Sequence, residues 1–149
     1  MEAITFYSYK GGVGRSLALT NIAQYLARFE FNVCIMDFDL EAPGLHYKFQ
    51  KVMPEQKPMM GLVDYISTYY LERKLISIKD IATRLNNPKG SKGTVHLITA
   101  GEIGPDNNLG PGYLETLSSI AWDDLLYSEK HHGALFFMNL KAQIEEELK

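Results

Sequence analysis

Residues 9–16, YKGGVGRS, have the residue types needed to hold a phosphate group. Glycine reaches backbone conformations that are closed to residues with a Cβ, so successive N–H groups in such a stretch can turn inward around an anion. A helix that starts directly afterwards adds its unpaired N–H groups and the positive end of its dipole. The chemistry predicted here is therefore phosphate binding. A glycine-rich strand-to-helix turn without a ligand is the alternative.

The stretch matches the general phosphate-loop pattern G-x-x-x-x-G-K-[ST] only in part. Gly14 and Ser16 match, whereas Tyr9 occupies the position of the first glycine and Arg15 that of the lysine. Arginine keeps a cation near the phosphates, but its planar fork is bulkier than an ammonium, so phosphate affinity can survive while catalytic geometry changes. By its motif position, Ser16 is expected to offer its hydroxyl oxygen to Mg²⁺.

Two carboxylates, Asp37 and Asp39, follow the apolar run at 33–36. The carboxyl ends of strands in open α/β sheets form the ligand crevice, so both acids are expected at the same edge as the glycine loop. Solvated turn residues that cap the following segment are the alternative interpretation.

The order of elements around these residues predicts the fold class. Residues 2–8 are short and rich in β-branched and aromatic types, which favours a strand. Apolar residues three or four apart predict a helix from Ser16 to about Arg28, and residues 33–36 follow as a buried strand. Strand, loop, helix and strand form a βαβ unit, which predicts an α/β protein with a parallel sheet covered on both faces.

The rest of the chain supplies further elements. An irregular loop is predicted at 45–58, helices at 61–74, 113–127 and 134–149, a third strand at 95–98 and a glycine-rich loop at 101–112. Three sets of residues are expected to pack in the protein rather than to take part in binding or catalysis. They are the tyrosines at 65, 69 and 70, His96 in the third strand, and Cys34.

Composition excludes several classes of protein. The 149 residues are 46% hydrophobic and 22% charged, which is enough for one globular domain with a core. The net charge is −3 and there is no Lys/Arg-rich tract, so no nucleic-acid surface is indicated. No apolar run suits a membrane span or a signal peptide, and a cytoplasmic protein is expected. The single cysteine cannot form an intrachain disulfide.

With Lys10 included, KGGVGRS at 10–16 resembles the deviant Walker A sequence K-G-G-x-G-K-[ST] of the ParA/MinD family of P-loop ATPases. The resemblance implies a P-loop NTPase fold, three layers with a mainly parallel sheet, and ATP and Mg²⁺ as cofactors. Arg15 departs from the pattern, and the choice of ATP over GTP rests on the resemblance alone. The implied nucleotide-binding residues are Gly11, Gly12, Val13, Gly14, Arg15 and Ser16.

The resemblance also implies roles for individual residues. Lys10 is expected to reach the phosphates of a facing subunit in an ATP-dependent homodimer. Asp37, with Ser16, belongs to the metal site and acts on a metal-bound water, while Asp39 orients the attacking water. Lys10, Arg15 and Asp39 are thus the expected catalytic residues.

One element of that family is not found in the sequence, namely an apolar strand that ends in Asp, the Walker B strand, with its switch loop. The late apolar run 134–138 ends in Asn139 and continues with helical spacing, and a degenerate strand there is the alternative. In the family's sheet the missing strand lies between the strands at 2–8 and 33–36. Residues 1–149 are therefore expected to be the N-terminal portion of a single ATPase domain. A non-hydrolysing nucleotide-dependent interaction module and an inactive fragment are the alternatives to an active ATPase.

Overall fold

The computed structural model describes residues 1–10, 12, 14–86, 90–129 and 133–148, and it has helices packed on both faces of a small sheet. In chain order the elements are α1 (Arg15–Arg28), β1 (Val33–Met36), α2 (Leu45–Phe49), α3 (Leu62–Glu72), α4 (Ile78–Ile81), β2 (Ala82–Arg84), β3 (Val95–Ile98), α5 (Tyr113–Ser118), α6 (Trp122–Tyr127) and α7 (Gly133–Glu147).

The sheet of the described residues has three strands in the order β1-β3-β2. β1 and β3 are parallel, with Val33 opposite Val95 and Met36 opposite Ile98. β2 pairs with β3 in the antiparallel direction. The predicted α/β class and the parallel pair are confirmed. The sheet is mixed because the antiparallel β2 joins it, and this strand was not predicted from the sequence. Its three residues are too few to show a periodic pattern.

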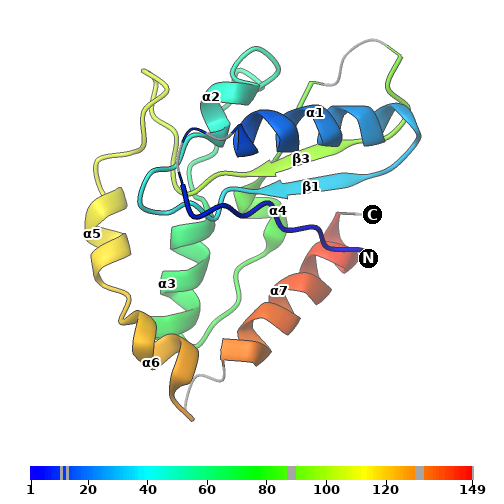
Figure 1. Ribbon diagram of the computed structural model, residues 1–149. Helices are drawn as coiled ribbons and strands as arrows, with labels where there is room; N and C mark the ends of the chain where they lie inside the picture. The colour runs from blue at the N-terminus through cyan, green and yellow to red at the C-terminus, as the bar shows by residue number, and fades with distance from the viewer. Residues whose placement is uncertain (11, 13, 87–89, 130–132, 149) are drawn as a thin grey trace.

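Helices cover both faces of the sheet, as Figure 1 shows with α1 and α2 on one side and α3 and α7 on the other. Alternate residues of β1 pack against the helices on opposite faces of the sheet, because successive side chains of a strand point to opposite faces. Ile35 packs with Ala23 and Ala27 of α1. Cys34 and Met36 pack against the larger cluster that includes α3 and α7. The expected three-layer arrangement is therefore present.

The predicted strand at 2–8 is wrong. This segment is outside the three-stranded sheet of the described residues, and Ile4 and Tyr7 are 69% and 78% exposed. In Figure 1 it runs as an extended chain toward the end of α7, where the Met1 ammonium donates to Glu145 Oε1 at 2.8 Å. A strand requires a neighbour for its backbone N–H and C=O groups. The resemblance implies that the missing strand lies between residues 2–8 and β1. Without that strand, the β-prone residues 2–8 have no neighbour with which to pair.

Most of the other predicted elements are confirmed, with three corrections. The loop predicted at 45–58 begins with the five-residue helix α2. The apolar run 134–138 lies inside α7, so the degenerate strand is wrong. The single helix predicted at 113–127 is divided into α5 and α6. Ser118 and Ser119 at this break turn their hydroxyls back onto the carbonyl oxygens of Glu115 and Thr116, a bond that competes with continued helix formation.

The tyrosines of α3 lie on a packed helical face, as predicted. Tyr65 is fully buried and donates to Gln143 Oε1 at 2.6 Å, and the rings of Tyr65 and Tyr69 pack against Phe136. Tyr70 donates to Asp124 Oδ2 at 3.0 Å.

In the described ranges, none of the helices has the length and apolar character needed to cross a membrane.

Candidate functional site

The described residues of the glycine-rich turn lead directly into α1, and two of them have left-handed backbone conformations. Gly12 and Gly14 have φ values of 73° and 83°, in the left-handed region that costs other residues about 1–2 kcal/mol. A Cβ at either position would meet no atom within 4 Å, so the conformation demands glycine and the space over the turn is open. Gly11 and Val13, two of the predicted binding residues, lie outside the described residues.

The first turn of α1 leaves its N–H groups free for an anion. Gly14 is the N-cap and forms no side-chain cap bond, and there is no acidic residue in the first turn of this described helix. The first N–H groups of a helix have no partner within the helix itself. The start of α1 therefore presents unpaired donors and a positive dipole end at the open glycine turn.

Arg15 joins this turn to the loop after β1. Its Nη2 lies 3.3 Å from Asp39 Oδ2, and the two side chains are 33% and 45% exposed. The predicted meeting of the glycine loop and the carboxylates at one edge is thus observed for this pair. An exposed ion pair of this kind contributes only about 0–1 kcal/mol, so Arg15 can turn from Asp39 to another anion at little cost.

Asp37 organises the loop between β1 and α2. It is 3% exposed, and its Oδ2 accepts the backbone N–H groups of Gly44 at 3.1 Å and Leu45 at 3.0 Å. Its Oδ1 has a longer contact of 3.4 Å to the N–H of Asp39. Burial raises the pKa of Asp37, and these backbone hydrogen bonds oppose that rise. Asp37 therefore caps the start of α2, as the alternative interpretation proposed, but from a buried position rather than a solvated one.

The donor groups at this edge suit Mg²⁺. Ser16 is half-buried in the first turn of α1, next to Arg15, and its hydroxyl is an oxygen donor like the carboxylates of Asp37 and Asp39. Asp37 Oδ1 has only one long contact, so it keeps lone pairs for a metal-bound water. Across the described ranges there is no group of three or more His, Cys, Asp or Glu that could hold a metal ion. Mg²⁺ is usually bound by one or two carboxylates together with phosphate oxygens and waters, which are the ligand types that Asp37, Asp39 and Ser16 could complete.

The Lys10 side chain has no ion-pair partner among the described residues. It is exposed, while the Lys10 carbonyl oxygen accepts the Ser8 hydroxyl at 2.7 Å. This is the arrangement expected of a lysine that acts outside its own subunit, and also that of a surface charge.

Sequence reasoning missed the contribution of the late helices to this region. The hydroxyl of Tyr113 on α5 donates to the Leu40 carbonyl oxygen at 2.7 Å, and burial, followed by the nearby Asp37 and Asp39, raises the Tyr113 pKa to about 12. A pocket of about 440 Å³ lies between the same loop and helices α5 and α6. No local pattern marks such residues, because they act across the fold. The pocket is lined by Phe38, Asp39, Leu40, Glu41, Leu117 and Trp122.

A left-handed glycine turn that opens a helix, with carboxylates on the loop after β1, defines a nucleotide-binding domain of the P-loop class. The chain belongs to the CobQ/CobB/MinD/ParA nucleotide binding domain family, whose model matches residues 4–143. This confirms the resemblance to ParA/MinD-like P-loop domains. No curated protein matches the chain. No solved structure matches it either.

Proposed function

We propose that this chain binds ATP with Mg²⁺ and hydrolyses it as a ParA/MinD-like ATPase. The observation that carries the proposal is the open left-handed glycine turn at the start of α1, which the Arg15–Asp39 pair joins to the carboxylate loop. The N–H groups of the turn and the Arg15 guanidinium bind the phosphates. Ser16, with Asp37 or its bound water, would hold Mg²⁺, which neutralises charge on the β- and γ-phosphate oxygens.

The Arg15–Asp39 pair suggests how binding prepares the site for hydrolysis. When Arg15 turns to the phosphates, the Asp39 carboxylate loses its partner and becomes free to accept a proton from the attacking water. Asp37 holds the loop through the N–H groups of Gly44 and Leu45, so Asp39 is held near the site. The reaction therefore depends mainly on positioning and on stabilisation of phosphate charge.

Nucleotide-dependent dimerisation or partner switching is the proposed consequence of ATP binding. The exposed Lys10 would neutralise phosphate charge on a facing subunit, in a space from which the second protomer excludes water. We place this activity in the cytoplasm and assign residues 1–149 to the N-terminal portion of one ATPase domain. The small sheet, in which β1 pairs on one side only among the described strands, supports that assignment.

Isothermal titration with ATP, GTP and ADP, each with and without Mg²⁺, tests the proposal. Tighter binding of ATP that depends on Mg²⁺ is expected. Asp39→Asn should keep this affinity or strengthen it up to about fivefold, because Arg15 no longer has to leave the Asp39 carboxylate. It should lose turnover, because the amide cannot accept the proton. Equal affinity for the three nucleotides, or no binding of any, would defeat the proposal.

A second candidate is a nucleotide-dependent interaction module that barely hydrolyses ATP. Arg15 favours it, because a bulkier cation replaces the compact ammonium and pairs with the residue that should orient water. Arg15→Lys separates the two candidates. A sharp rise in turnover at unchanged affinity would support the module, whereas a fall would make Arg15 a working catalytic residue.

The proposed dimer is tested with Lys10→Ala. Sedimentation velocity with ATP and Mg²⁺ should show a dimer for the wild type and a monomer for the variant, with nucleotide affinity only modestly weaker. Lys51→Ala, which removes another exposed lysine, is the matched control. An ATP-dependent dimer that persists in Lys10→Ala would contradict this role and show that Lys10 is a surface charge only.

A further inference from the structure

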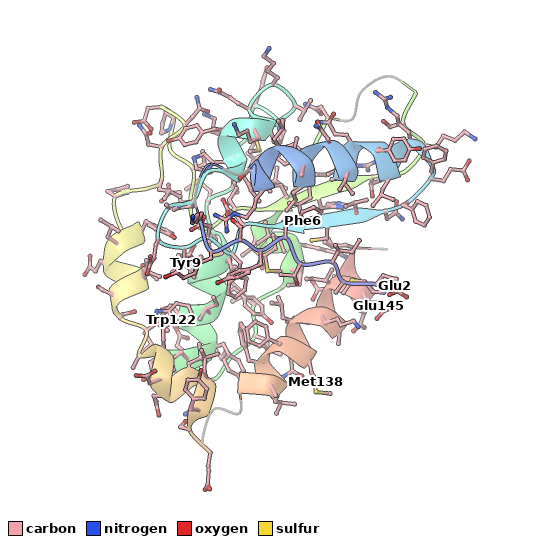
Figure 2. The ribbon with its side chains drawn as sticks, in the orientation of Figure 1. Glu2, Phe6, Tyr9, Trp122, Met138 and Glu145 are labelled. Atoms are coloured by element: carbon pink, nitrogen blue, oxygen red, sulfur yellow. The ribbon has the colours of Figure 1, made fainter. Side chains whose placement is uncertain are left out.

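A second candidate site adjoins the nucleotide region. The pocket of about 440 Å³ lies between the loop after β1 and helices α5 and α6, and Figure 2 labels Trp122 at the start of α6. Its lining includes no residue of the glycine turn. We propose that this pocket binds the side chain of an arginine presented by a partner protein.

The lining has the chemistry that recognises a guanidinium group. Phe38 and Trp122 supply aromatic rings, and Asp39 and Glu41 supply carboxylates. Cations are attracted to the faces of aromatic rings, and most strongly to that of tryptophan. A carboxylate accepts the paired N–H groups of a guanidinium in a bidentate hydrogen bond. The remaining lining residues, Leu40 and Leu117, suit the methylene stem of the same side chain.

The balance of charge in the pocket also favours a cation. Glu41 is exposed and forms no ion pair within the described part of the chain. Asp39 has the Arg15 guanidinium as its partner, at a distance of 3.3 Å. Two carboxylates therefore face one internal cation. An incoming arginine would balance the remaining negative charge.

Arginine fits better than lysine for two physical reasons. Its guanidinium is planar, so it can stack on the Phe38 or Trp122 ring while its edge meets a carboxylate. It is also hydrated more weakly than an ammonium, so less is lost when a partly apolar pocket removes its water.

The surroundings of the pocket favour a protein over a free small molecule. Leu114 lies one turn from Leu117 on α5 and is 73% exposed. On another side, the Phe38 ring packs at 5.9 Å from that of Phe137 on α7, which is 43% exposed. This apolar rim offers contact area that a partner's neighbouring residues can bury.

The test uses Trp122 as its own reporter, because it is the only tryptophan of the chain. The probe is the peptide acetyl-Leu-Arg-Leu-amide, and its control is the same peptide with neutral citrulline in place of arginine. Both are titrated against the full chain without nucleotide, so the result is independent of the proposed ATPase activity. The arginine peptide should change the Trp122 emission saturably and bind more weakly at high salt. The citrulline peptide should bind at least about fivefold more weakly, because the charge-assisted hydrogen bonds are lost.

Matched variants identify the residues involved. Glu41→Gln should weaken binding of the arginine peptide about fivefold. Glu146→Gln, which removes an exposed carboxylate near the far end of α7, should leave it unchanged. Equal binding of the two peptides, or wild-type affinity in Glu41→Gln, would overturn the assignment of the site. Binding of free N-acetyl-arginine amide as tight as that of the peptide would overturn the assignment to a protein partner.

Discussion

The hydroxyl of Tyr113 donates a hydrogen bond of 2.7 Å to the carbonyl oxygen of Leu40, across 73 positions of sequence. Tyr113 is buried in α5, and Leu40 is the residue after Asp39. A helix from the last third of the chain therefore holds the loop that carries a proposed catalytic residue. The position of Asp39 depends on α5 as well as on β1.

Removal of this hydroxyl should loosen the loop. Tyr113→Phe leaves the Leu40 carbonyl without its donor, which should lower the free energy of unfolding by about 1–3 kcal/mol. Faster hydrogen exchange at the amides of residues 38–41 should accompany the change. Urea unfolding and exchange mass spectrometry measure the two effects. Tyr127→Phe is the control, because Tyr127 is 82% exposed. Equal losses in the two variants would contradict the role of Tyr113.

The elements that sequence reasoning predicted well depend on local pattern. The helix at 16–28 and the strands at 33–36 and 95–98 have strong apolar periodicity or short β-branched runs, and they appear as α1, β1 and β3. Residues 2–8 have a comparable composition but no neighbouring strand in the sheet. Composition predicts what a segment can form, while pairing decides whether it forms.

The residues of the candidate site were also predictable only where a local sequence motif marks them. The glycine turn and the two aspartates were predicted because their spacing follows a motif. The distinct roles of Asp37 and Asp39 were not, since they arise from burial: Asp37 is enclosed by the N–H groups of Gly44 and Leu45, whereas Asp39 is exposed. Tyr113 and Trp122 carry no local signal, and only the packing of α5 and α6 brings them to the loop.

A Cβ at Gly14 should meet no steric clash, but it should strain the left-handed backbone conformation of the turn. Gly14→Ala meets open space, yet its φ of 83° imposes about 1–2 kcal/mol of strain on the phosphate-binding form. ATP affinity should therefore fall about tenfold, as measured by isothermal titration. Gly112→Ala is the matched control, because Gly112 also faces open space but has a φ of −82°. Unchanged affinity in Gly14→Ala would show that the turn does not bind in this conformation.

The two aspartates should differ in their effect on stability. Asp37→Asn weakens the buried acceptor for the N–H groups of Gly44 and Leu45, so the free energy of unfolding should fall by about 1–3 kcal/mol. Asp39→Asn removes only an exposed ion pair and should cost less than about 1 kcal/mol. Urea unfolding of both variants checks this order. A larger loss in Asp39→Asn would contradict the structural role of Asp37.

Cys34 should make the fold sensitive to alkali. Burial raises its pKa from 9.0 to about 12, so above pH 9 the unfolded chain releases the thiol proton while the folded chain keeps it. The stability that comes from keeping this partly buried thiol protonated is complete below pH 9 and is lost as pH rises toward 12. Between pH 8.5 and 10 this should remove about 1 kcal/mol from the free energy of unfolding. Urea unfolding at both pH values should show a smaller loss in Cys34→Ala, and equal losses would contradict the assignment.

Nucleotide binding and arginine binding should assist each other through Asp39. In the free protein Asp39 pairs with Arg15 at 3.3 Å, and the proposed phosphate contact draws Arg15 away. The freed carboxylate has two oxygens, so one can accept from the attacking water while the other accepts from an arginine in the pocket. An exposed pair of this kind is worth up to about 1 kcal/mol, so a saturating non-hydrolysable ATP analogue with Mg²⁺ should strengthen binding of the arginine peptide about two- to fivefold. Linkage requires that the peptide strengthen nucleotide binding by the same factor.

Arg15→Gln should remove this coupling, because the variant has no guanidinium to transfer from Asp39 to the phosphates. Peptide affinity should then be the same with and without saturating nucleotide, even though the variant binds nucleotide more weakly. Arg28→Gln, at the other end of α1, should keep the wild-type coupling. Titration of Trp122 fluorescence with the peptide, in the presence and absence of nucleotide, gives the ratio directly. A two- to fivefold effect that persists in Arg15→Gln would mean that the two sites communicate by a route other than the Arg15–Asp39 pair.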